Sequence, residues 1–152
     1  MTDTPKSRPV ELLTFKLGDH EYSLDIMSVR EIRSWSRATP LPHAPSYMRG
    51  VINLRGTVLP VMDLAERLGL PKCGASDRNV IIVAKHADTL TGLLVDAVSD
   101  IVALDESDMQ APPETGHQNG PSVIKWLTLI DERMVRVLDL SHIVGRPESD
   151  AA

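Results

Sequence analysis

Cysteine, aromatic side chains, an excess of positive charge and long hydrophobic runs are all scarce or missing in this sequence. The single cysteine, Cys73, excludes an internal disulfide bond, which suits a cytosolic protein. Aromatic residues make up 3% of the 152 residues, so we expect an aliphatic core. A formal net charge of −5 argues against nucleic acid or an anionic membrane as the main partner. No apolar run approaches the roughly 20 residues that span a bilayer, and the first residues lack the apolar segment of a signal peptide.

Sequence motifs for catalysis, metal binding and nucleotide binding are missing as well. The five histidines are scattered, and no H-E-x-x-H or C-x-x-C pattern is present to hold a metal ion. The phosphate-binding patterns G-x-x-x-x-G-K-[ST] and G-x-G-x-x-G are absent, as is the nucleophile pattern G-x-S-x-G. We therefore expect no catalytic residue, no metal and no cofactor. A small hydrolase with a site assembled from distant residues is kept as an alternative to a pure binding protein.

Short β-prone runs separated by turn residues dominate the chain, which predicts an all-β protein with few short helices. Asp63-Leu64-Ala65-Glu66 fits a capping box at the start of a short helix that Gly69 ends. The run from Ile26 to Ile32 fits either a helical turn or a strand. Many short strands favour two small barrels over an open sheet, because closure removes unpaired edges. The expected strands are Leu12–Leu17, Gly50–Leu54, Thr57–Met62, Asn79–Lys85, Leu90–Val95, Ala97–Leu104, Ile124–Ile130 and Met134–Leu138.

Two parts of the sequence resemble each other. Val58–Gly69 parallels Met134–Gly145, since each is a β-prone run followed by an aspartate N-cap and a short apolar turn that ends at glycine. A second similarity pairs Val29–Ile32 with Val98–Ile101. These similarities occur in the same order, which predicts two related β-rich halves.

The halves are expected over residues 10–70 and 78–146, which together form one domain over 10–146. Residues 71–77 would link them, and flexible tails are expected over 1–9 and 147–152. The polar, Pro- and Gly-rich stretch 105–122 predicts a long flexible loop inside the second half.

The stretch from Gly50 to Leu64 is the most specific signal in the chain. Two β-prone runs meet at Arg55-Gly56, the composition of a tight hairpin in which Gly56 supplies a positive φ. The turn would place Arg55 at the hairpin tip, facing solvent or a partner. An arginine held on a rigid turn is a good recognition group for a carboxylate. The alternative is an ordinary solvated turn residue.

This hairpin, G-V-I-N-L-R-G-T-V-L-P-V-M-D-L, resembles the signature of the CheW family, the coupling proteins of bacterial chemotaxis. Upstream, F-K-L-G-D-H-E-Y-S-L-D-I and V-R-E-I fit the opening of the family, and G-L-L-V-D-A-V-S-D-I fits the start of its second half. The similarity runs in order from about residue 11 to about residue 145. It implies a CheW-like fold of two SH3-like five-stranded β-barrels packed side by side.

The resemblance also implies a non-catalytic adaptor that couples chemoreceptors (methyl-accepting chemotaxis proteins) to the histidine kinase CheA. It implies receptor contacts at Val29, Glu31, Arg55, Val98 and Ile101. Weaker similarity implies contacts with the CheA regulatory domain at Arg49, Gly50 and Val58. For the three apolar receptor positions, simple core packing is the alternative.

The family also implies a cytoplasmic location at the membrane-associated receptor array, without direct membrane insertion. The same fold occurs as a detached kinase regulatory domain and as a coupling protein of other chemosensory pathways such as twitching motility. These readings stay open as alternatives.

Overall fold

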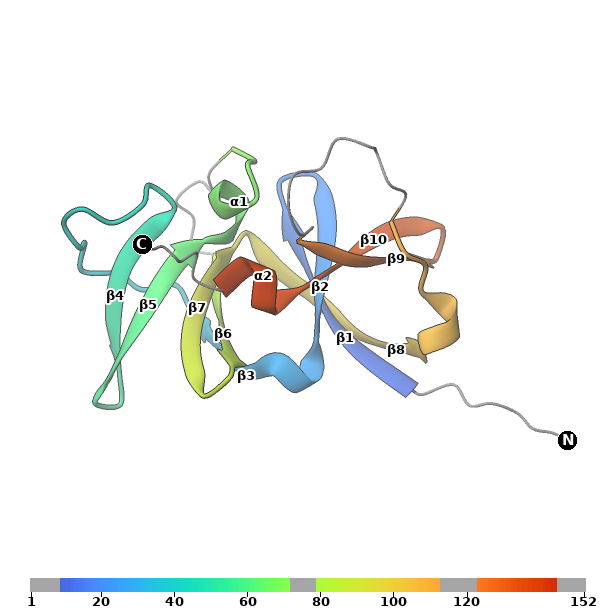
Figure 1. Ribbon diagram of the computed structural model, residues 1–152, viewed down its shortest axis with the longest axis horizontal. Coiled ribbons are helices and arrows are strands. Elements are labelled where there is room, and N and C mark those ends of the chain that lie inside the picture. The colour runs from blue at the N-terminus through green and yellow to red at the C-terminus, as the bar shows by residue number, and fades with distance from the viewer. Residues whose placement is uncertain (1–8, 72–78, 113–122, 145–152) are drawn as a thin grey trace, which may run out of the picture.

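Ten strands and four short helical segments make up the described part of the computed structural model, residues 9–71, 79–112 and 123–144 (Figure 1). The strands are β1 (Pro9–Leu17), β2 (His20–Asp25), β3 (Val29–Ser34), β4 (Met48–Leu54), β5 (Thr57–Asp63), β6 (Val80–His86), β7 (Thr89–Val95), β8 (Ala97–Asp105), β9 (Ile124–Ile130) and β10 (Arg133–Leu138). The helical segments are the 3₁₀ turns η1 (Ile26–Ser28) and η2 (Glu106–Asp108) and the α-helices α1 (Leu64–Arg67) and α2 (Leu140–Val144). The predicted all-β fold class is therefore confirmed.

The strands form two five-stranded sheets of matching topology. Sheet A has the order β8-β1-β2-β10-β9, and sheet B has the order β3-β6-β7-β5-β4. Each sheet combines antiparallel pairs with one parallel pair, β2 with β10 in sheet A and β5 with β7 in sheet B. In Figure 1 sheet B occupies the left side of the molecule and sheet A the right side.

The predicted division of the strands into residues 10–70 and 78–146 is wrong, although the predicted repeat is present. Each half contains a hairpin, a single strand, a second hairpin and a short helix. The first hairpin of each half pairs with the rest of the other half: β1–β2 joins β8–β10, and β6–β7 joins β3–β5. The sequence pattern marks the strands, whereas the choice of partner depends on residues far along the chain.

Neither sheet is a closed barrel. The predicted SH3-like architecture is confirmed in the form of two strongly curled sheets. In sheet B a single bridge, Thr39 with Val51, joins the segment after β3 to the opposite edge strand β4. In sheet A the bridge of Gln110 with Leu127 joins the segment after β8 to β9 in the same way. The curl therefore brings the two edges of each sheet together.

Local structure agrees with some of the sequence predictions and differs from others. The Asp63 side chain caps α1 by accepting a hydrogen bond from the Glu66 amide at 3.2 Å, as predicted. The ambiguous run 26–32 contains both expected forms, because η1 precedes strand β3. Two boundaries are wrong: Pro9 opens β1 instead of ending a tail, and residues 105–110 form the end of β8, η2 and a bridge.

The remaining predicted segments lie outside the described residues. They are residues 1–8 and 147–152 of the predicted tails, most of the linker with Cys73, Gly145 at the end of the repeat, and residues 113–122 of the predicted loop.

One continuous hydrophobic core extends through both sheets and is aliphatic, as predicted. Phe15 is the one aromatic residue among the largest fully buried side chains of the described chain. Leu13, Phe15 and Leu17 of β1 belong to the same buried cluster as Ile81 and Leu93 of sheet B. Helix α2 completes the contact between the sheets, since the Arg67 guanidinium at the end of α1 donates to the carbonyls of His142 and Ile143 at 2.9 and 3.1 Å.

Candidate partner-binding surface

The β4–β5 hairpin has the tight turn that the sequence predicts. Leu54 pairs with Thr57, which leaves Arg55 and Gly56 as a two-residue loop. Their φ angles of 51° and 88° are both positive, as in a type I′ turn. The Asn53 side chain accepts a hydrogen bond from the Gly56 amide at 2.8 Å and stiffens the turn. Arg55 itself thus adopts a left-handed conformation, which the sequence analysis assigned to Gly56 alone.

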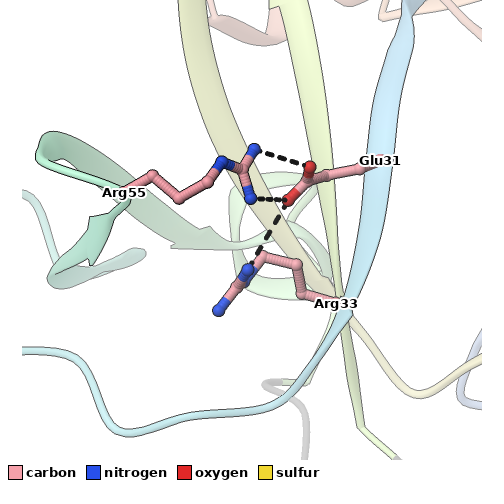
Figure 2. Close-up of polar contacts among 3 residues, drawn as sticks. All are labelled: Glu31, Arg33 and Arg55. Atoms are coloured by element: carbon pink, nitrogen blue, oxygen red, sulfur yellow. Dashed lines mark hydrogen bonds and ion pairs between the residues drawn. The ribbon is translucent and has the colours of Figure 1, made fainter.

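The Arg55 side chain reaches back from the tip to Glu31 on β3 (Figure 2). Two hydrogen bonds join the groups, at 2.9 Å from Nη2 to Oε1 and at 3.4 Å from Nη1 to Oε2. Arg33 approaches the same carboxylate at 3.5 Å. Because β3 and β4 are opposite edges of sheet B, this ion pair links the hairpin tip to the other edge of the curled sheet.

The charges of this cluster are mutually stabilised but accessible. The hydrogen bond from Arg55 is the largest influence on the pKa of Glu31 and holds it below its ordinary value of 4.5, while partial desolvation acts in the opposite direction. The same bond raises the pKa of Arg55. The Arg55 side chain is 68% exposed and that of Glu31 is 26% exposed. An exposed pair of this kind contributes little to folding, so its fixed geometry is available for recognition.

The other predicted receptor residues lie on two edge strands. Val29 opens β3 and Val98 lies near the start of β8, and both are partly buried against the core. Ile101 of β8 is 52% exposed. The structure joins Glu31 and Arg55 by direct contact, whereas Val98 and Ile101 belong to sheet A and pair with β1. Core packing accounts for part of the role of Val29 and Val98.

Sequence reasoning missed two exposed apolar residues beside these positions. Met27 in η1 is 87% exposed and Ile32 in β3 is 45% exposed. Their exposure makes both side chains candidate contacts for a protein partner. No local sequence pattern separates them from buried apolar residues, although the repeat aligns Ile32 with Ile101 and both are exposed on an edge strand.

The three predicted kinase residues lie on the β4–β5 hairpin but differ in exposure. Val58 is 68% exposed and pairs with Asn53 on the outer face of the hairpin. Arg49 is partly buried at a bulge of β4. Gly50 is buried with a φ of 137°, and a Cβ atom there would lie 2.2 Å from the Thr39 carbonyl oxygen. Its demonstrable role is to let the Thr39–Val51 bridge form.

Neither a metal site nor a membrane-spanning helix is found in the described part of the chain. Those residues contain no group of three His, Cys, Asp or Glu side chains placed to hold a metal ion. Helices there are all too short or too polar to cross a membrane. What the surface offers is an ion-paired arginine on a rigid turn, exposed apolar side chains on edge strands and an exposed hairpin face. These features are typical of a protein that works by binding other proteins.

The chain belongs to the CheW family, whose CheW-like domain matches residues 11–148. It is 46% identical over 142 residues to the probable chemotaxis protein CheW of Rhizobium etli, covering 93% of this chain and 92% of that protein. It is 44% identical, with the same coverage, to the chemotaxis protein CheW of Rhizobium meliloti.

A solved structure carries the same fold. The crystal structure of the scaffolding protein TtCheW from Thermoanaerobacter tengcongensis matches with a TM-score of 0.85 and 29% identity, over 95% of this chain and 98% of that chain. Family and fold together make this chain a non-catalytic chemotaxis coupling adaptor and remove the small-hydrolase alternative.

Proposed function

We propose that this chain connects the cytoplasmic tip of methyl-accepting chemoreceptors to the regulatory domain of the histidine kinase CheA, at the membrane-associated receptor array. The proposal combines the coupling role of the family with two sets of exposed or partly exposed residues on this molecule, one assigned to each partner. The receptor surface contains the Glu31–Arg55 ion pair and the exposed side chains of Met27, Ile32 and Ile101. The kinase surface contains Val58, on the outer face of the β4–β5 hairpin, and Arg49, at the bulge of β4.

The observation that carries the receptor assignment is the bidentate contact between Arg55 and Glu31 (Figure 2). The pair holds the Arg55 guanidinium in place against Glu31, so binding of a receptor there costs little further side-chain entropy. The exposed side chains of Met27 in η1 and Ile32 on β3 supply apolar area that a helical receptor tip can cover.

Arg55→Ala should weaken binding to a receptor tip roughly 10- to 100-fold, the scale of a lost charge-assisted hydrogen bond. Arg55→Lys should restore only part of this, because an ammonium group cannot reproduce the planar fork. Binding to the kinase regulatory domain should remain within about twofold for both variants, and the melting temperature within about 2 °C. Titration calorimetry with each partner and a thermal melt give these values.

Asp131→Ala is the matched control, since Asp131 occupies the equivalent turn position of the β9–β10 hairpin and has a φ of 52°. It should leave receptor binding unchanged. Normal receptor binding by Arg55→Ala would reduce Arg55 to a solvated turn residue, and an early melt would make its role structural.

The variant Val58→Asp tests the kinase surface. Loss of kinase binding with intact receptor binding would support that surface, and loss of receptor binding with intact kinase binding would contradict it.

A further inference from the structure

A small pocket opens beside the kinase surface, between the segment after β3 and the inner part of sheet B. It has a volume of about 250 Å³. Trp35, Arg37 and Arg49 line it together with the aliphatic side chains of Val61 and Leu94. The pocket therefore combines two cationic groups, one indole and an apolar floor. Coupling a receptor to a kinase does not by itself require a pocket with this set of side chains.

Within the described part of the chain the two arginines have no counter-charge. Neither side chain has a hydrogen bond or an ion pair with another described residue, although Arg49 is partly buried. Residues 26–62 contain five arginines and only one acidic residue, Glu31. Glu31 is already held by Arg55 and Arg33. Two guanidinium groups in one partly enclosed pocket repel each other, so an anion that enters gains from both.

The internal repeat provides a second pocket at the equivalent place in sheet A. Arg49 is the extra residue of the β4 bulge, and Lys125 is the extra residue of the corresponding β9 bulge. Val61 and Leu94 correspond by strand register to Val137 and Asp25. Lys125, Val137 and Asp25 line one pocket with Glu106 and Trp126.

The two pockets differ in the balance of charge among their lining residues. The sheet A pocket contains one cation and two carboxylates, Asp25 and Glu106, so its charge is already balanced by its own residues. The sheet B pocket contains two cations and no acidic residue in its lining. The two equivalent pockets thus differ in charge, and of the two it is the sheet B pocket whose described lining holds guanidinium groups without a carboxylate.

We propose that the pocket lined by Trp35, Arg37 and Arg49 is a carboxylate-binding site. Two guanidinium groups suit a planar carboxylate, and the indole with the aliphatic floor suits an apolar or aromatic body attached to it. Two sources share this chemistry: a free small organic acid, and an acidic side chain on a protein partner. The inference goes beyond the proposed function, and Arg49 is the one residue that it shares with the kinase surface.

The two tryptophans of the chain make the test direct, because Trp35 lines one pocket and Trp126 lines the other. The full chain labelled with ¹⁵N is titrated with benzoate, with the neutral analogue benzamide, and with a blocked Leu-Glu dipeptide, while the two indole N–H signals are followed by NMR. Trp35→Phe assigns the signals. We expect the Trp35 signal to shift saturably with a carboxylate and not with benzamide, and the Trp126 signal to stay in place.

The variant Arg37→Gln with Arg49→Gln should weaken carboxylate binding at least tenfold, while Lys125→Gln in the sheet A pocket should leave it unchanged. Binding of benzoate alone identifies a free acid as the source, and tighter binding of the dipeptide identifies an acidic side chain. Absence of saturation with both carboxylates, an equal response to benzamide, or an unaffected double variant with native indole signals overturns the proposal. No kinase or receptor is present, so the outcome is independent of the coupling function.

Discussion

Arg55 shows how a single residue is both exposed and fixed. Its backbone is held by a type I′ turn, and its guanidinium is held by the Glu31 carboxylate 24 positions earlier in the chain. An unfixed surface arginine loses considerable side-chain entropy on binding, whereas Arg55 has lost much of it on folding. The position therefore suits recognition without contributing much to stability.

The ion pair predicts how Glu31 titrates. Its folded-state pKa lies below the ordinary value of 4.5, chiefly because of the Arg55 hydrogen bond. The pair therefore adds stability above the unfolded-state pKa, and this contribution is lost as the pH falls through the folded-state value. In Arg55→Ala the pKa of Glu31 should rise, as measured by carboxyl ¹³C NMR, with a smaller rise in Arg33→Ala. An unchanged Glu31 titration in Arg55→Ala would mean that the pair does not persist in solution.

Features that depend on a few neighbouring residues were predicted correctly from the sequence, whereas contacts between distant residues were not. The hairpin tip at Arg55 and the Asp63 cap follow from four or five neighbouring residues, and both are confirmed. The contact of Arg55 with Glu31 depends on how sheet B curls, so no local pattern predicts it. Met27 and Ile32 were missed because an exposed apolar residue has the same sequence signature as a buried one.

Among the elements, the hairpin β4–β5 depends on a glycine that the sequence analysis placed in a binding role. Gly50 allows the Thr39 carbonyl to approach and to accept a hydrogen bond from Val51 at 2.9 Å. That bridge is the link between the segment after β3 and strand β4. Its loss would open the curl of sheet B and separate Arg55 from Glu31.

Gly50→Ala should destabilise the fold by roughly 2–4 kcal/mol, from backbone strain and from the displaced bridge. Gly18→Ala is the control, because Gly18 has a φ of 61° but no atom within 4 Å of a built Cβ, so only the conformational cost of about 1 kcal/mol applies. Urea unfolding of both variants measures the difference. Equal destabilisation would show that the Thr39 contact does not constrain this position.

At the scale of the whole molecule, the exchange of hairpins between the two halves makes the sheets interdependent. Residues 10–70 contain β1 and β2 without β8–β10, and β3–β5 without β6 and β7. The repeat is visible in the sequence because strand and cap patterns are local. The exchange is not visible there, because both halves present equivalent strands and only packing in space selects the partner.

A fragment of residues 10–70 should therefore be unfolded alone, with a disordered far-ultraviolet dichroism spectrum. Mixing it with the fragment 78–146 in equal amounts should restore the β spectrum of the intact chain. Sheet A needs the hairpin β1–β2 from the first fragment, and sheet B needs the hairpin β6–β7 from the second. A folded, monomeric fragment 10–70 would contradict the interdependence and return the molecule to two sequential units.

In the proposed function one molecule holds a receptor and a kinase at the same time on separate surfaces. Sedimentation velocity of the chain saturated with the CheA regulatory domain, with a receptor tip then added, measures this directly. We expect a three-component complex in which the receptor-tip affinity stays within about twofold of its value without the kinase domain. Displacement of either partner by the other, or failure to bind one of them, would contradict the account.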